Sequence, residues 1–185
     1  MLLNHLLINK YIKSLDGDYS DDERDAIAYA AEGILGECEK LFIMAVIFAL
    51  LHQFIPFVCV FAVFAVFRTN CGGIHMKTFF GCLAYSATLF AGIIYLSPYL
   101  SNRVFLLWYM ILAITIGIKA PIISDNHLTP DRGTFIRRKV VGVVVTLTLL
   151  VLDLCIDSQL MMCARGTVIA YAIELLYIVI RRRSS

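Results

Sequence analysis

Charged side chains are scarce in this 185-residue sequence. Asp, Glu, Lys and Arg make up 16% of the residues, whereas soluble domains average about 25%; apolar residues make up 60%, against about 45–50%. Two stretches, residues 41–67 and 78–102, contain no Asp, Glu, Lys or Arg at all. This shortage excludes a soluble domain and predicts an integral membrane protein. With a net charge of only +2, we expect a lipid bilayer, and no nucleic acid, as a partner.

A cysteine motif and a targeting signal are also missing from the sequence. The six cysteines include no C-x-x-C pair, so a zinc or redox motif has little support. Cys71, His75 and Cys82 offer an alternative metal site, but no fourth ligand is visible, and we expect neither a metal nor a cofactor. The opening "MLLNHLLINKYIKSL" carries a histidine and two lysines where a signal peptide needs an unbroken apolar run. We therefore expect no cleaved signal.

The long uncharged runs predict an all-α, polytopic membrane helix bundle with about six transmembrane helices. A span needs about 20 apolar residues, so residues 41–67 are too long for one crossing and too short for two. The sequence "LHQFIP" inside them suits a turn, with His52, Gln53 and Pro56 at the far interface. If the first span borrows residues from Glu32 onward, six helices fit, over 32–51, 54–68, 78–102, 104–118, 140–156 and about 160–180.

These spans predict a single membrane domain over 1–185. Residues 1–31 form an amphipathic segment at the cytoplasmic interface, 32–180 form the bundle, and 181–185 form a cytoplasmic tail. Within the first segment, Ser20 and the acidic residues directly after it suit the start of a helix, because carboxylates are favourable in the first helical turn.

The distribution of basic residues indicates how the chain crosses the membrane. With six spans, the inner segments hold most of the lysines and arginines, including Arg137, Arg138 and Lys139, whereas the outer turns hold little beyond Arg103 and Arg165. This follows the positive-inside rule. A single span over 41–67 would put the N-terminus outside and break the pattern. We therefore predict a multi-pass protein of the cell membrane with both termini cytoplasmic.

The cytoplasmic loop 68–77 and the helix after it carry the most reactive side chains. A thiolate is a strong nucleophile and an imidazole can take its proton, so Cys82 and His75 form a candidate dyad. Seven residues separate them by about 10 Å along a straight helix, too far for proton transfer. The dyad requires either a loop that folds back at His75 or a helix that starts after Thr78 with Gly81 allowing close approach. Gly72 and Gly73 supply the flexibility for this. On spacing alone, an incidental structural pair is the alternative.

The pattern "R-x-x-x-GG-x-H-x-K…GC" after the second span, with "KAPIIS-x-N" closing the fourth, resembles the AgrB family. The matching positions are Arg68, Gly72, Gly73, His75, Cys82, Ala120 and Pro121. One departure is Met76, where the family commonly has alanine, and this changes neither proposed catalytic group. The resemblance extends over nearly the whole chain in the order of spans and the charge of loops.

The resemblance implies a membrane cysteine endopeptidase of a Gram-positive quorum-sensing system. Such enzymes cut an AgrD-type propeptide toward its C-terminus through a thioester and close a thiolactone or lactone ring. Cys82 would be the nucleophile and His75 the general base. The competing interpretation is a peptide exporter or small membrane transporter without proteolytic chemistry. A homodimer fits a small bundle, although no interface motif stands out.

Other residues have two interpretations each. Arg68 either pairs with the acidic part of the propeptide or anchors the end of the second span. Glu174 either orients His75, binds Arg68 or is a structural partner inside the bundle, since buried acids in lipid usually pair. The cluster 137–139 is a topology signal or a docking patch. Backbone amides near Gly81 and Cys82 are the expected oxyanion donors.

Overall fold

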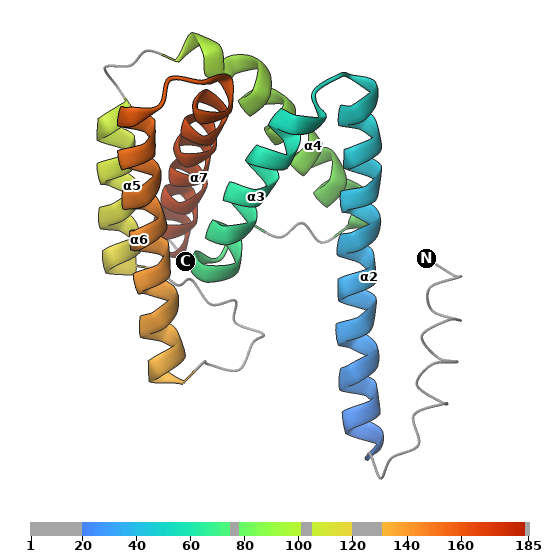
Figure 1. Ribbon diagram of the computed structural model, residues 1–185. Helices are drawn as coiled ribbons and strands as arrows, with labels where there is room; N and C mark the ends of the chain where they lie inside the picture. The colour runs from blue at the N-terminus through green and yellow to red at the C-terminus, as the bar shows by residue number, and fades with distance from the viewer. Residues whose placement is uncertain (1–19, 75–77, 101–104, 120–130, 184–185) are drawn as a thin grey trace. The chain divides into compact units, whose positions relative to one another are not determined.

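The computed structural model of the protein describes residues 20–74, 78–100, 105–119 and 131–183, and all regular elements within these ranges are helical. The all-α prediction is therefore confirmed. The chain divides into two compact units, one ending at Leu50 and the other beginning at Leu51. Figure 1 labels the elements, which are α2 (Asp21–Leu50), α3 (Phe54–Cys71), α4 (Phe79–Leu96), the short 3-10 helix η1 (Ser97–Tyr99), α5 (Phe105–Lys119), α6 (Arg132–Cys155) and α7 (Gln159–Arg183).

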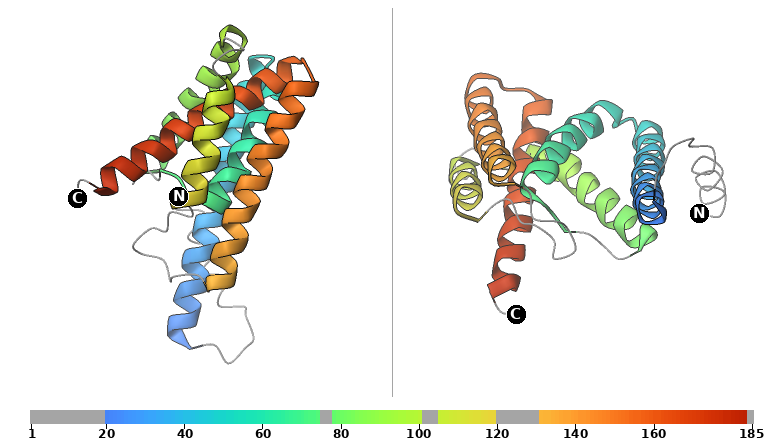
Figure 2. Two further views of the ribbon diagram at one scale, coloured as in Figure 1. Left: turned by 90° about the vertical axis from the view of Figure 1, so that its left-hand side faces the viewer. Right: turned by 90° about the horizontal axis from the view of Figure 1, so that it is seen from below.

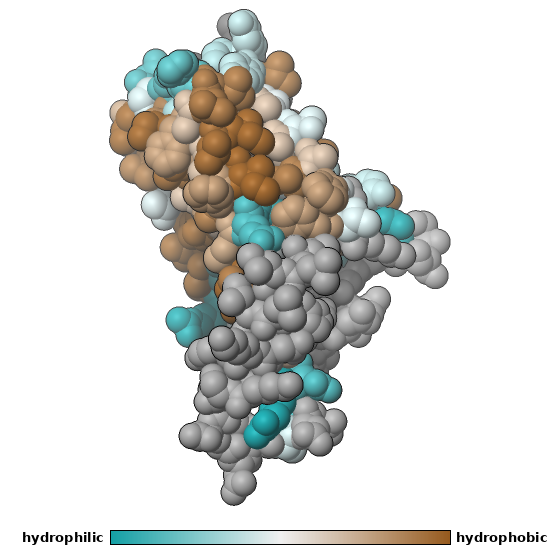
Figure 3. Space-filling view, turned by 90° about the vertical axis from the view of Figure 1, so that its right-hand side faces the viewer, coloured by the Kyte–Doolittle hydropathy of each residue, from teal (hydrophilic) through white to brown (hydrophobic). Residues whose placement is uncertain are grey.

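Three of the described helices are long and apolar enough to cross a membrane. They cover Phe54–Cys71, Phe79–Tyr99 and Gln159–Arg181, and α5 is a shorter apolar helix. Large apolar side chains such as Phe42, Leu50 and Phe80 remain exposed, as is expected where lipid replaces water. Figure 3 shows such residues, in brown, gathered over the upper part of the face that it draws. An all-α membrane bundle is confirmed, and the count of six crossings stays a prediction.

In the first unit, the structure describes Ser20 and helix α2. The helix starts with a cap in which Ser20 and Glu23 bond to each other's backbone N–H. The Ser20 backbone N–H donates to Glu23 Oε2 (2.9 Å), and the Glu23 N–H donates to Ser20 Oγ (3.4 Å). These are the two bonds of a capping box. The bond from the Ser20 N–H, with that from its hydroxyl, lowers the pKa of the Glu23 carboxyl. The helix then continues without a break past residues 31 and 32, where we expected the amphipathic segment to end.

A tight turn precedes α3, as the sequence indicated. Residues 51–53 separate α2 from α3, and His52 has a φ of 57°, which is unusual for a residue with a side chain. Pro56 is the third residue of α3. It is tolerated there because the first N–H groups of a helix have no partner within the helix. The predicted turn is confirmed, and α3 extends three residues beyond the predicted end at residue 68.

The fifth predicted helix begins earlier than expected. We expected a helix over 140–156, but α6 begins at Arg132 because Asp131 caps it. The Asp131 side chain accepts the Gly133 N–H (3.2 Å) and its carbonyl accepts the Phe135 N–H (2.9 Å). The basic cluster is therefore helical: Arg137 and Arg138 are exposed, and Lys139 lies with its Nζ 5.8 Å from the Phe135 ring centre.

Helix α7 is the centre of the second unit. It packs against α3, α4, α5 and α6 (Figures 1 and 2). Its Tyr171 ring is fully buried, stacked on Phe67 and edge-on to Phe64. The aromatic residues of α3 at positions 64 and 67 therefore form core packing.

A buried ion pair joins α6 to α7. Arg165 donates from Nε to both carboxylate oxygens of Asp153 (3.2 and 2.9 Å) and from Nη2 to Oδ1 (2.9 Å), and its guanidinium lies 4.6 Å from the Phe105 ring centre on α5. The sequence had suggested that Arg165 lies in an outer turn. It lies instead within α7, where the carboxylate compensates its burial.

Replacing one partner of this pair should destabilise the second unit strongly. In Arg165→Ala the Asp153 carboxylate stays buried without its cation, and losses for such broken pairs are about 3–5 kcal/mol. Denaturation in mixed micelles, followed by circular dichroism, measures this loss. The double variant Asp153→Leu/Arg165→Met should recover most of it, and Asp157→Asn, which changes an exposed carboxylate, should cost less than about 1 kcal/mol. Equal stability of Arg165→Ala and the wild type would contradict the assignment.

Candidate functional site

The glycine pair lies where α3 ends. The Gly72 N–H donates to the carbonyl of Arg68 (3.1 Å) and closes the helix. Gly72 has φ 92° and ψ −177°, a conformation that only glycine adopts without strain. Residues 72–74 then continue as non-helical chain. The first glycine of the motif is therefore required by the backbone that leaves α3.

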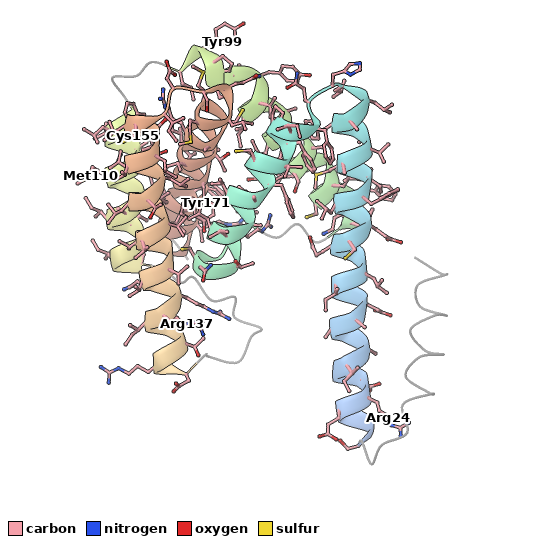
Figure 4. The ribbon with its side chains drawn as sticks, in the orientation of Figure 1. Arg24, Tyr99, Met110, Arg137, Cys155 and Tyr171 are labelled. Carbon is pink, nitrogen blue, oxygen red and sulfur yellow. The ribbon has the colours of Figure 1, made fainter. Side chains whose placement is uncertain are left out.

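Three side chains hold this segment by its backbone. The Tyr171 hydroxyl donates to the Gly72 carbonyl (2.6 Å), the Ile74 N–H donates to Glu174 Oε1 (2.6 Å), and Arg68 Nη2 donates to the Ile74 carbonyl. Tyr171 and Glu174 come from α7 and Arg68 from α3 (Figures 1 and 4; Figure 4 labels Tyr171). Arg68 and Glu174 thus bind the two polar groups of one residue.

Gly73 fits between these two side chains. A Cβ at this position would lie 3.1 Å from Arg68 Cγ and Nε and 3.3 Å from Glu174 Oε1. Such contacts are tighter than normal, so any larger residue would push the arginine and the carboxylate apart. The two glycines thus have different roles: Gly72 allows a backbone conformation and Gly73 allows a close approach.

Glu174 is the deepest carboxylate of the site. Only 5% of its surface is exposed, and its second oxygen, Oε2, has no hydrogen-bond partner among the described residues. Arg68 and Tyr85 interact with it electrostatically. Both described roles of Glu174, the bond to the Ile74 backbone and the interaction with Arg68, thus concern the segment that precedes His75.

Cys82 lies in the first turn of α4. The helix begins at Phe79, directly after Thr78, which meets one condition of the second arrangement for the dyad; the close approach at Gly81 stays a prediction. The thiol residue is buried, with 7% of its surface exposed. Tyr85, three residues further on the same helix, is the residue that interacts with Glu174 and Arg68. The described residues therefore bring α4, α3 and α7 together around one group of polar side chains.

The expected oxyanion donors are already used. The Gly81 N–H donates to Thr78 Oγ1 (3.2 Å), and the Cys82 N–H donates to the Thr78 carbonyl (3.0 Å). Both bonds belong to the cap of α4, in which a threonine side chain satisfies an N–H that the first turn leaves without a partner. These two amides therefore already have acceptors in this conformation, and the role of amides near Gly81 and Cys82 as oxyanion donors stays a prediction.

Two other predictions were the approach of His75 to Cys82 and the alternative metal site that includes Cys71. His75 lies outside the described residues, so its distance from Cys82 stays a prediction. Cys71 is fully buried, and its Sγ lies 2.6 Å from where a Cβ on Gly142 of α6 would stand. This sulfur therefore fills a close contact between α3 and α6, and Gly142 allows that contact. Ala120, Pro121 and His127 also lie outside the described residues.

Sequence reasoning missed Tyr171. Its hydroxyl is the buried donor that satisfies the Gly72 carbonyl, and it also lies 3.3 Å from the Phe67 carbonyl. One signal was present in the sequence: Tyr171 lies three residues before Glu174, which places both on one face of a helix. A tyrosine buried in this way usually has a partner for its hydroxyl.

Comparisons with known proteins agree with one another. A family model described as Accessory gene regulator B matches residues 5–180. An AgrB-like protein of Clostridium beijerinckii is 28% identical over 131 residues, which cover 69% of this chain and 65% of the relative. No solved structure matches the chain significantly.

Alanine at Gly72 should destabilise the second unit by about 1–3 kcal/mol, because a side chain there is strained at φ 92°. Gly92→Ala is the matched control: its Cβ would meet nothing within 4 Å inside α4, and helical alanine is favoured over glycine by about 0.5–1 kcal/mol. Thermal unfolding in detergent compares them. A Gly72→Ala protein as stable as the Gly92→Ala protein would contradict the assigned conformation.

Proposed function

We propose that this chain, which belongs to the AgrB family, is a membrane cysteine endopeptidase that cleaves an AgrD-type propeptide near its C-terminus and cyclises the product. Membership of the family gives it a role in the accessory gene regulator system. The chain spans 65% of the length of its curated relative. The chemistry, the propeptide substrate and the cyclisation are accordingly our proposal.

One observation carries the proposal. Cys82 is buried in the first turn of α4. The segment 72–74 leads directly to His75, and side chains of α3 and α7 hold its backbone by hydrogen bonds. A nucleophile and a base work together only when both are held near their reacting geometry. Anchoring the residue before the histidine limits where the imidazole can go, and so supports its use as a base.

The reaction follows from these two groups. Cys82 Sγ attacks the scissile carbonyl while His75 takes the thiol proton, and the imidazolium then gives that proton to the leaving amine. The peptide is now a thioester on Cys82. A cysteine thiol or serine hydroxyl of the peptide attacks the thioester, a base removes its proton, and the Cys82 sulfur leaves and is reprotonated. The ring is closed as a thiolactone or a lactone, and the enzyme returns to its starting state.

Arg68 has a structural role in this scheme. Its guanidinium binds the Ile74 carbonyl and lies 5.7 Å from the Phe64 ring centre. The sequence offered two roles for Arg68, docking the acidic part of the propeptide or anchoring the end of the second span. We assign the second role, in which Arg68 also holds the backbone of residues 72–74. Arg137 and Arg138 are exposed on α6 and are the better candidates to meet an acidic peptide.

The topology completes the proposal. We assign the chain to the cell membrane of a Gram-positive bacterium as one membrane domain, with about six crossings and both termini cytoplasmic, because this arrangement leaves the basic residues inside. The connection between α3 and α4, which begins at Gly72, is then cytoplasmic, where a newly made propeptide arrives. A homodimer remains compatible with this arrangement.

Replacing either proposed catalytic group should abolish processing. We expect co-expression of Cys82→Ser or His75→Ala with the propeptide to give no cyclic product and at least 100-fold less cleavage, because each variant removes the nucleophile or its base. Mass spectrometry of the peptide products measures both. Cys155→Ser, which alters an exposed cysteine at the end of α6, is the matched control and should keep wild-type activity.

The products separate the competing functions. Full cleavage by both variants would eliminate the endopeptidase and favour the exporter. A linear product alone from the wild-type protein would retain the protease and remove the cyclase.

A further inference from the structure

Helix α4 places a tyrosine one turn after Cys82. Tyr85 follows the cysteine by three residues, and side chains at i and i+3 of a helix are neighbours, with Cβ atoms about 5–6 Å apart. Cys82 and Ser86 belong to the buried face of α4, with 7% and 8% of their surfaces exposed, whereas Tyr85 is half-buried. The phenol therefore lies at the edge of that face, open to a bound peptide.

The geometry of a helix directs the Tyr85 ring toward Cys82. Long side chains in an α-helix point back toward its N-terminus and lie over the residues at i−3 and i−4. For Tyr85 these residues are Cys82 and Gly81. Gly81 has no side chain and leaves room for the ring beside the cysteine. Ser86 is the other hydroxyl residue of this turn, but its short side chain reaches less far back than the phenol.

The surroundings of the phenol come from three helices. Helix α4 packs against both α3 and α7, and Tyr85 interacts electrostatically with Arg68 of α3 and Glu174 of α7. These two side chains bind the carbonyl and the N–H of Ile74. The phenol thus lies on the side of α4 that faces the backbone of residues 72–74. Because Arg68 matches the charge of Glu174, an anion formed beside the phenol does not face an unpaired carboxylate.

A cysteine endopeptidase needs hydrogen-bond donors for an oxyanion. When the sulfur adds to the scissile carbonyl, the oxygen becomes negatively charged, and donors aimed at it are usually the largest single contribution to catalysis. The N–H groups of Gly81 and Cys82 already donate to Thr78. The Tyr85 hydroxyl forms no hydrogen bond with another residue that the structure describes, so its proton is not committed to an acceptor there.

We propose that Tyr85 is a further catalytic residue, whose hydroxyl donates a hydrogen bond to the oxyanion on the scissile carbonyl. This inference rests on the proposed function. As Cys82 Sγ bonds to the carbonyl carbon, an electron pair of the C=O bond moves onto the oxygen, and Tyr85 stabilises this charge while keeping its proton. The pair returns when the C–N bond breaks and the amine leaves with the proton that the thiol released.

The same donor serves the second half of the reaction. The thiol or hydroxyl of the peptide adds to the thioester carbonyl, and the negative charge develops on the same oxygen. It is lost when the bond to the Cys82 sulfur breaks and the ring is released. Tyr85 forms and breaks no covalent bond in either half, so one hydroxyl assists both cleavage and cyclisation.

Tyr85→Phe removes the hydroxyl and keeps the ring. We expect kcat for propeptide cleavage by the full chain in proteoliposomes to fall about 100-fold, because the loss of one oxyanion donor costs about 10²–10³. KM should stay unchanged, since this bond forms only in the transition state. Tyr95→Phe, which alters an exposed tyrosine later in α4, is the matched control and should keep the wild-type kcat. A wild-type kcat in Tyr85→Phe would overturn the inference.

Alkylation of Cys82 separates an oxyanion donor from a structural residue. Iodoacetamide loses iodide to the sulfur without forming an oxyanion, so Tyr85→Phe should be alkylated at the wild-type rate and should unfold at the wild-type temperature. A parallel fall in alkylation and cleavage would overturn the inference, because Tyr85 would then act on the thiol or on its packing. Loss of cleavage in Ser86→Ala, with none in Tyr85→Phe, would also overturn it.

The variants also separate this inference from the proposed function. If Cys82→Ser cleaves the propeptide normally, the proposed function is lost, and the oxyanion role of Tyr85 with it. If Cys82→Ser is inactive while Tyr85→Phe keeps the wild-type kcat, only the role of Tyr85 is overturned.

Discussion

The interaction on which the rest of the second unit depends is the binding of non-helical backbone by side chains of α7. A backbone N–H or C=O buried away from water costs about 1–3 kcal/mol when it has no partner, so irregular chain in a protein interior is tolerated only where other groups satisfy it. Between α3 and α4, Tyr171 satisfies the Gly72 carbonyl, Glu174 the Ile74 N–H and Arg68 the Ile74 carbonyl. This allows a break between two apolar helices next to a buried thiol.

The same interaction explains the glycine pair better than flexibility does. A side chain at Gly72 would oppose the turn that aims its carbonyl at Tyr171, and a side chain at Gly73 would separate Arg68 from Glu174. The two glycines therefore specify a closely packed backbone over residues 72–74. Close packing at this point suits the proposed catalysis, because misplacing a reacting group by about 1 Å is costly.

Features set by local rules were predictable from the sequence. Pro56 and the polar residues before it gave the turn ahead of α3, and uncharged runs gave the apolar helices. Features set by partners distant in sequence were not. Arg165 was assigned to a turn because its pairing with Asp153 could not be predicted from the sequence. Tyr171 was missed because its acceptor is 99 residues away. The early start of α6 was missed because its cap, Asp131, lies in a stretch rich in loop residues.

The burial of Cys82 bears on why a site of this kind would cyclise its substrate. A thioester can be attacked by water or by a nucleophile of the peptide itself. An intramolecular attack gains an effective concentration of about 10⁵–10⁸ M in well-oriented cases. Cys82, with 7% of its residue surface exposed, also gives water little access to a group bound at its sulfur. Both effects favour the ring over the linear acid. They depend on the same closed packing of α3, α4 and α7 that fixes the glycine segment, so the selectivity and the geometry of the proposed reaction have one structural origin.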